Sequence, residues 1–206
     1  MHVLLMITTH LSAMHLQFIL KCWPVFVRQS PLLRGSDVLF YSTKTPPTAF
    51  RMLFRGAFSV KLYHNPGYQE GAIRAMTDLQ AHPEWASSYD WVIRLNPDVI
   101  VKNDTWLRSQ MSDPSVDGIF VDCLSRPCTT RCIDNQIHTD FAVFRPRTVL
   151  NNWINITNAE DHATKLFHNV TQHGRDRWLQ GTTHYKQCRV KHTDIVHTHA
   201  LPAECQ

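Results

Sequence analysis

The stretch from Tyr89 to Val101, YDWVIRLNPDVIV, constrains the fold more than any other part of the chain. Its first half, up to Leu95, is an almost continuous apolar run, which is typical of a strand buried on both faces of an α/β sheet. Pro97 has no amide hydrogen for a central ladder, so the strand must end there or reach a sheet edge. The sequence therefore places Asn96 and Asp98 at the carboxyl end of a central strand, where open α/β sheets have their ligand crevice.

An apolar strand that runs into an acidic x-Asp pair, and then into more apolar residues, resembles the DxD region of nucleotide-sugar glycosyltransferases with the GT-A fold. The resemblance is to the small nucleotide-diphospho-sugar transferase domains of algae and large algal viruses. It implies that Asp98 holds a divalent cation, Mn²⁺ or Mg²⁺, which in turn holds the diphosphate of the donor. Asn96 occupies the first acidic position of the motif, and the resemblance implies that it also lies in the donor site. An Asn-Pro-Asp turn also closes strands for purely conformational reasons.

The composition indicates one globular domain. A chain of 206 residues with 43% hydrophobic and 18% charged residues is long enough and apolar enough to bury a sizeable core. We expect a single GT-A-like domain, with a nucleotide-binding half over about 1–101 and an acceptor and metal-completing half over about 102–206. The net charge of +4 is spread along the chain. Without a basic block, we expect no nucleic-acid partner.

The N-terminal apolar run, Val3 to Ile7, is too short for a membrane span and lacks the basic flank of a signal peptide. We therefore expect no membrane span in this chain and a cytoplasmic location. The alternative is the Golgi lumen, if an upstream anchor is missing. Three N-glycosylation sequons, which begin at Asn103, Asn155 and Asn169, fit a luminal protein, although such triplets also arise by chance.

Six cysteines are present, and three of them crowd into the segment CLSRPCTTRC, which begins at Cys123. The spacing is not that of paired CxxC motifs, which argues against a structural zinc site. In an oxidising compartment we expect a disulfide within this segment or from it to Cys188, and in a reducing one free thiols.

The first part of the chain predicts alternating strands and helices. Val3 to Thr9 is a buried strand, Ser12 is positioned to cap the next helix, and Pro24 should bend or end that helix. Further strands are expected at 36–42 and 57–63. Between these two strands we expect a helix, and the spacing of Arg51 and Arg55 would place both on one face of it, where they meet either a phosphate or solvent.

The resemblance implies that the end of the first strand meets the base and ribose of the donor. The matching residues are Thr8, Thr9 and His10. His10 could equally be a solvated loop residue.

The stretch from His64 to Gly71 combines turn residues and glycines before a helix expected at 72–80. Glycine permits close backbone approach, and a helix N-terminus presents amides to an anion. The stretch is neither GxGxxG nor a P-loop, so neither a dinucleotide site nor an NTPase is indicated. The resemblance implies that Gly67 lies over the nucleotide and Arg74 near the sugar or diphosphate. The alternative is a tight turn with a surface arginine.

Two acidic positions in the second half match the family. The pattern x-x-Asp-Phe-x-x-x-Arg-Pro, around Asp140, resembles a strand beneath the donor sugar and acceptor, where a carboxylate binds sugar hydroxyls or acts as base. The alternative is a structural pair with Arg145 or Arg147. The resemblance also implies that Glu160 or Asp161, at the start of a helix over 162–173, deprotonates the acceptor hydroxyl. Favourable interaction with the helix dipole explains such acids equally well.

Two histidines near the C-terminus, His197 and His199, are two residues apart on an extended segment and so point to the same face. In several GT-A enzymes a late histidine completes the cation site begun by the DxD, and this would offset the missing acid at Asn96. Imidazole is the softer part of such a mixed site. Either histidine could instead be an ordinary exposed residue.

The order of these features along the chain resembles GT-A order over nearly the whole sequence. We expect an α/β fold, a GT-A-like three-layer sandwich whose mostly parallel central sheet has helices on both faces. The expected activity is a metal-dependent hexosyl- or deoxyhexosyl-transferase that uses a nucleotide sugar and a glycan or glycoprotein acceptor. One rival is a nucleotidyltransferase-like sugar-nucleotide enzyme, which would want a Gly-rich signature after the first strand. The other is a non-catalytic carbohydrate-binding module on the same fold.

Overall fold

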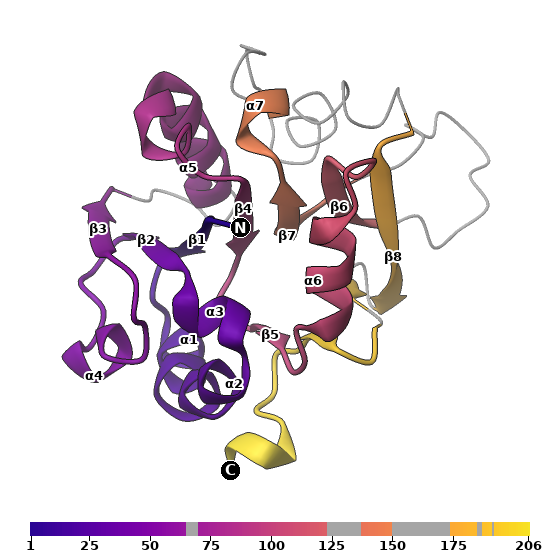
Figure 1. Ribbon diagram of the computed structural model, residues 1–206. Helices are drawn as coiled ribbons and strands as arrows, with labels where there is room; N and C mark the ends of the chain where they lie inside the picture. The colour runs from indigo at the N-terminus through magenta and orange to yellow at the C-terminus, as the bar shows by residue number, and fades with distance from the viewer. Residues whose placement is uncertain (65–69, 123–136, 150–173, 185–186, 191) are drawn as a thin grey trace, which may run out of the picture.

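The computed structural model describes residues 1–64, 70–122, 137–149, 174–184, 187–190 and 192–206. Its centre is a sheet of eight strands in the order β3-β2-β1-β4-β7-β6-β8-β9 (Figure 1). The strands are β1 (Val3–Thr9), β2 (Asp37–Ser42), β3 (Phe58–Leu62), β4 (Trp91–Leu95), β6 (Gly118–Asp122), β7 (Ile137–Phe144), β8 (Asp176–His184) and β9 (Gln187–Val190). A separate antiparallel pair joins β5 (Val99–Val101) to β10 (Ile195–His197).

The first four strands of that order are parallel to one another, and β6 and β8 are also parallel. β7 runs antiparallel to both of its neighbours, β4 and β6. In the parallel half, Ile7 pairs with Leu95 and Thr9 with Ser42. The carboxyl ends of β1, β2 and β4 therefore meet at one edge of the sheet, and the predicted mostly parallel α/β sheet is confirmed.

Helices cover both faces of the sheet (Figure 1). Along β1 every side chain is buried, and alternate residues enter different cores. Leu5 packs with the segment after β1, including Phe18, whereas Met6 packs with Leu79 of α5 (Glu70–Ala81). α6 (Thr105–Ser112) joins the first core through Leu107. This burial on both faces explains why the strands are apolar runs rather than alternating patterns.

The helical segment after β1 continues further than the sequence predicted. Ser12 caps α1 (Ala13–Gln17) by accepting a hydrogen bond from His15 N at 3.1 Å, as expected. A π-helical turn (Phe18–Cys22) follows, and then α2 (Trp23–Gln29). Pro24 lies in the first turn of α2 and does not end the helical segment. Proline is tolerated at this position because the hydrogen-bond pattern changes from π-helical to α-helical there, so the N–H that proline lacks is not required.

Three shorter helices lie between or after the strands of the sheet. They are α3 (Pro31–Gly35) before β2, α4 (Thr48–Arg51) before β3 and α7 (Pro146–Val149) after β7. The predicted pair of arginines on one helix face is wrong, because α4 ends at Arg51 and Arg55 lies beyond it. The guanidinium of Arg51 instead lies over the Phe58 ring, 5.4 Å from its centroid. Short 3-10 helices occur at Pro83–Trp85 and Ala203–Cys205. Within the described ranges no helix is both long enough and apolar enough to cross a bilayer.

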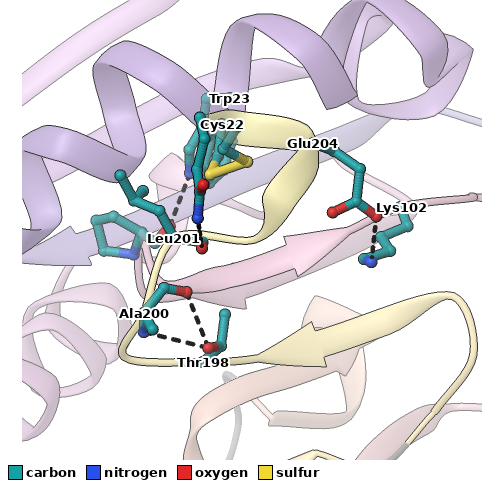
Figure 2. Close-up of a disulfide and its surroundings, with 10 residues drawn as sticks. Cys22, Trp23, Lys102, Thr198, Ala200, Leu201 and Glu204 are labelled. Carbon is teal, nitrogen blue, oxygen red and sulfur yellow. Dashed lines mark hydrogen bonds and ion pairs between the residues drawn. A yellow bond between two sulfur atoms is a disulfide. The ribbon is translucent and has the colours of Figure 1, made fainter.

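A disulfide joins Cys22 of the π-helical turn to Cys205, 183 residues later (Figure 2). The same region is tied by a second contact, an ion pair of 2.8 Å between Lys102 Nζ and Glu204 Oε1. The C-terminal segment is therefore anchored to the helical layer beside β5. The sequence did not predict this pairing, and the segment from Cys123 to Cys132, where a disulfide was expected, lies outside the described residues.

Candidate metal centre

The turn that ends β4 buries a carboxylate at the carboxyl edge of the sheet. Val99 N donates to Asn96 O at 3.0 Å, which closes the turn, and Trp23 Nε1 donates to Pro97 O at 2.9 Å. Asp98 sits within this turn and is only 3% exposed. A carboxylate this deeply buried needs compensating partners.

Three imidazoles surround one oxygen of that carboxylate. Asp98 Oδ2 lies 3.3 Å from His199 Nδ1, 3.4 Å from His197 Nε2 and 3.7 Å from His15 Nε2. Burial alone would raise the pKa of Asp98, but the contacts with His15 and His197 outweigh it and hold that pKa below its usual range. Asp98 is therefore an anion at neutral pH.

β10 delivers the two late histidines to Asp98. It pairs with β5 so that His197 is opposite Val99, the residue after Asp98, and Thr198 N donates to Asp98 O at 3.2 Å. A turn follows, in which Ala200 N donates to Thr198 Oγ1 at 3.2 Å (Figure 2). The expected common face of His197 and His199 is thus directed at the turn after β4, and neither is an ordinary exposed tail residue: their side chains are 2% and 30% exposed.

These three residues have the geometry of a cation site. Asp98, His197 and His199 each offer one ligand atom, and the three atoms lie within 4.8 Å of one another. Ligands bonded at about 2.1 Å to one ion lie about 3 to 4 Å apart, so small adjustments would suffice. Asp98 Oδ1 is also buried and accepts no hydrogen bond within the described part of the chain, so a cation would satisfy an otherwise orphaned polar atom. The donor set therefore fits a divalent cation.

A second polar cluster adjoins the first and contains Asn96 and Asp140. Asn96 Nδ2 donates to Asp140 Oδ1 at 2.6 Å, and Asp140 Oδ2 lies 3.7 Å from His197 Nε2. On its other side, Asn96 Oδ1 accepts hydrogen bonds from Thr8 Oγ1 at 3.1 Å and Arg94 Nη2 at 3.0 Å. The side-chain amide of Asn96 therefore links the guanidinium of Arg94 to the carboxylate of Asp140. A second carboxylate at this position could not do so, because it has no hydrogen to donate to Asp140.

Arg94 is buried within β4 and was not singled out from the sequence. Burial lowers the pKa of Arg94 to about 10, although Asp140, Tyr63 and Asp98 act in the opposite direction. Arg145 and Arg147, the structural partners considered for Asp140, lie instead 3.1 and 3.8 Å from Asp117. Asp140 is thus held in the cluster at the carboxyl edge by Asn96, and Arg94 provides the nearby positive charge.

The end of β1 contributes to both clusters. Thr8 is engaged with Asn96, and Thr9 Oγ1 accepts a hydrogen bond from Leu11 N at 2.8 Å. His10 is partly buried, with its ring centroid 4.8 Å from that of His15, and burial together with His15 lowers its pKa. The two hydroxyls are therefore used within the protein, whereas the ring of His10 stays partly open to solvent.

His15 is a further site residue that the sequence did not reveal. It lies on the buried face of α1, within the helical segment that the sequence predicted. The one available signal was its position, shortly after a strand whose carboxyl end was expected to border the ligand crevice.

The structure does not bring Arg74 together with Asp98. Arg74 of α5 has a side chain that is 64% exposed, and its Nε lies 3.8 Å from Asp78 Oδ1, one helical turn on. Gly67, Glu160 and Asp161 lie outside the described residues.

No protein-family model matches the sequence, and a search of curated proteins finds no match. Solved structures do match. The mannosyltransferase PcManGT from Pyrobaculum calidifontis, in complex with GDP-Man and Mn²⁺, aligns over 91% of this chain with a TM-score of 0.52 and 15% sequence identity. The chain has the GT-A glycosyltransferase fold. It spans 56% of the length of that mannosyltransferase.

Two further structures illustrate the range of GT-A matches. The galactosyltransferase LgtC, in complex with donor and acceptor sugar analogs, aligns over 86% of this chain and 73% of its own, with a TM-score of 0.53 and 9% identity. A glycosyltransferase involved in glycosylation of the major capsid of PBCV-1 covers 87% of this chain and 82% of its own, at 13% identity and a TM-score of 0.48. The two matches with TM-scores above 0.5 show the GT-A fold, and identities this low show nothing finer. The predicted GT-A resemblance is confirmed at that level.

Proposed function

We propose that this chain transfers a hexosyl or deoxyhexosyl group from a nucleotide-diphosphate donor to a glycan or glycoprotein acceptor, with the help of a divalent cation. The observation that carries the proposal is the convergence of Asp98, His197 and His199 at the carboxyl edge of a GT-A sheet. A mannosyltransferase of the same fold, solved with GDP-Man and Mn²⁺, supports both the donor class and the cation.

The cation would be held by Asp98, His197 and His199. Two imidazoles and one carboxylate favour Mn²⁺ over Mg²⁺, because Mg²⁺ prefers oxygen ligands and keeps much of its water. When bound, the cation would neutralise charge on the diphosphate as the sugar leaves. The ionised state of Asp98, which the neighbouring imidazoles favour, is the state required of a ligand.

The other proposed roles concern the acceptor and the donor nucleotide. Asp140, held by Asn96 beside His197, would bind a sugar hydroxyl or accept the acceptor proton, a role for which Glu160 and Asp161 are the other candidates. On the donor side, the proposed contacts to the nucleotide and diphosphate come from Thr8, Thr9, His10, Gly67, Arg74 and Asn96. Of these, His10 is the described residue at the end of β1 that stays partly open to solvent.

A carbohydrate-binding module on the same fold is the second candidate, and Asn96 is the observation that favours it. A site with one acid where the family has two could have lost its metal and its catalysis. Asp98 Oδ1 argues against that loss, because this buried atom accepts no hydrogen bond within the described ranges and only a cation would compensate its burial.

For location, we propose an oxidising compartment rather than the cytosol. The disulfide between Cys22 and Cys205 would not persist in the reducing cytosol of most organisms. This favours the luminal alternative over the cytoplasmic one. Mass spectrometry of the protein isolated from its native source, with thiols blocked at lysis, would test it.

The function is tested by thermal unfolding with a panel of UDP- and GDP-sugars, each with and without Mn²⁺, followed by donor hydrolysis measured as release of the nucleoside diphosphate. We expect one donor to raise the unfolding temperature only with Mn²⁺ and to be hydrolysed. Asp98→Asn should abolish both effects. Glu84→Gln is the matched control, since Glu84 lies in the 3-10 helix before β4, at the opposite end of that strand, and its side chain is 66% exposed.

Two results would overturn the enzyme proposal. Stabilisation by free glycans but by no nucleotide sugar would favour the binding module. Donor hydrolysis that is unchanged in Asp98→Asn would show that the carboxylate after β4 is not part of the reaction.

A further inference from the structure

We propose that His15 is a positioning residue of the cation site, which holds the Asp98 carboxylate in place by directing an Nε2–H at its Oδ2. The inference rests on the proposed function, since it concerns the same site. It assigns a role to a buried histidine that neither the DxD-like motif nor the late histidine pair includes.

His15 is placed by local structure that leaves its ring little freedom. Its backbone N–H donates to the Ser12 side chain, which caps α1, and the residue is 3% exposed. Its ring lies beside that of His10, with centroids 4.8 Å apart. A polar ring buried this deeply is stable only if its nitrogens have partners.

Both ring nitrogens face a partner, and the pattern of donors indicates where the proton is. Nδ1 lies 2.8 Å from Thr9 Oγ1, and Nε2 lies 3.7 Å from Asp98 Oδ2. An ionised carboxylate can only accept a hydrogen bond, so the Nε2 that faces Asp98 carries the proton. Thr9, whose Oγ1 accepts the N–H of Leu11 at 2.8 Å, can then donate its hydroxyl proton to Nδ1. In that arrangement Nδ1 accepts, and the proton of a neutral imidazole is on Nε2, directed at Asp98.

These contacts lead from the Leu11 N–H to Thr9, from the Thr9 hydroxyl to His15, and from His15 Nε2, at 3.7 Å, towards the proposed metal ligand Asp98. Outer partners of this kind orient a carboxylate ligand and are typically worth about 10- to 100-fold in metal affinity. His15 is outside the group of ligand atoms that lie within 4.8 Å of one another in the described ranges, which comprises Asp98, His197 and His199. His15 therefore contacts the carboxylate without belonging to that group.

The test is Mn²⁺ affinity without nucleotide, measured by calorimetry and by the electron paramagnetic resonance signal of free Mn²⁺. We expect His15→Leu to weaken binding about 10- to 100-fold. His15→Gln should remain within about threefold of the parent, because its side-chain amide places an N–H donor where Nε2 was. His82→Gln is the control. His82 precedes β4 and its side chain is 49% exposed, so this variant should leave Mn²⁺ affinity unchanged.

A second pair of variants tests the tautomer. Thr9→Ser keeps the hydroxyl that donates to Nδ1 and should keep Mn²⁺ affinity, whereas Thr9→Val removes it and should weaken affinity about tenfold. Thermal unfolding of the metal-free proteins reports whether each variant is folded. If one variant shows no cooperative unfolding transition, the other variant at the same position is used in its place.

The outcomes separate this inference from the function. If the parent binds no Mn²⁺, the proposed cation site itself fails. If the parent binds Mn²⁺ and His15→Leu binds it equally well, only the role of His15 is overturned. If His15→Gln is as weak as His15→Leu, the imidazole is needed for something other than its N–H, and the positioning role is wrong.

Discussion

The side-chain amide of Asn96 donates a hydrogen bond of 2.6 Å to Asp140 Oδ1, while its oxygen accepts from Arg94 and Thr8. The predicted resemblance to the DxD region places Asn96 at the first acidic position of that motif. In this chain the position calls for a group that donates on one side and accepts on the other. An amide does both, and an ionised carboxylate can only accept.

Restoring the acid should therefore be harmful. Asn96→Asp would bring two carboxylates to hydrogen-bonding distance, and like charges so close together force one of them to hold a proton. We expect a loss of about 1 to 3 kcal/mol in the free energy of unfolding at pH 8. Urea denaturation of the metal-free protein would measure it.

The pH dependence of that variant has a definite sign. The shared proton raises one folded-state pKa above its unfolded value, so the folded state binds more protons and the loss grows as pH rises above about 4. The exchange variant Asn96→Asp/Asp140→Asn restores one donor and one acceptor and should recover most of the loss. Equal stability of Asn96→Asp and the parent at pH 8 would contradict this account.

Asp98 should contribute to stability in a pH-dependent way even without metal. His15 and His197 hold the pKa of Asp98 below its usual range despite burial. A depressed folded-state pKa gives stability that is present above about pH 4, the unfolded value, and is lost as pH falls further. Asp98→Asn should therefore be less stable than the parent at pH 7, with the gap narrowing below about pH 4. A gap that is constant from pH 7 to pH 3 would refute the ionised carboxylate.

Removing an imidazole should change which metal is bound. His199→Ala leaves Asp98 and His197, and we expect Mn²⁺ affinity to fall at least about tenfold. His199→Asp replaces a nitrogen ligand with oxygen and should shift the preference from Mn²⁺ towards Mg²⁺. Competition calorimetry with both ions would measure the ratio, with His82→Ala as the control. Unaltered Mn²⁺ affinity in His199→Ala would remove that residue from the site.

The disulfide should support the metal site as well as the fold. Cys22–Cys205 tethers the segment that begins with β10, which carries His197, to the helical layer. The variant Cys22→Ser/Cys205→Ser should lose about 2 to 5 kcal/mol of unfolding free energy. Its Mn²⁺ affinity should fall too, because the histidines are then positioned by strand pairing alone. Lys102→Ala, which breaks only the ion pair of partly exposed groups with Glu204, should cost less than about 1 kcal/mol.

Much of the fold could be read from local patterns. β1 spans the predicted residues, β4 ends at the predicted turn and Ser12 caps the predicted helix, because each feature depends on neighbours within a few residues. For Pro24 the local pattern left open whether it bends or ends the helix, and the structure shows that the helical segment continues through it. Whether a proline ends a helix depends on whether the turn before it can widen, and here a π-helical turn does so.

The candidate site divides along the same line. The sequence by itself determined that Asp98 follows a buried central strand and that His197 and His199 share a face, because strand burial and side-chain alternation are properties of short segments. Only the tertiary structure decided that His15, His197 and His199 meet around one oxygen of Asp98, that Asn96 donates a hydrogen bond to Asp140, and that Cys22 pairs with Cys205. Such contacts join residues far apart in the chain, and they are set by strand register and packing, which no local pattern encodes.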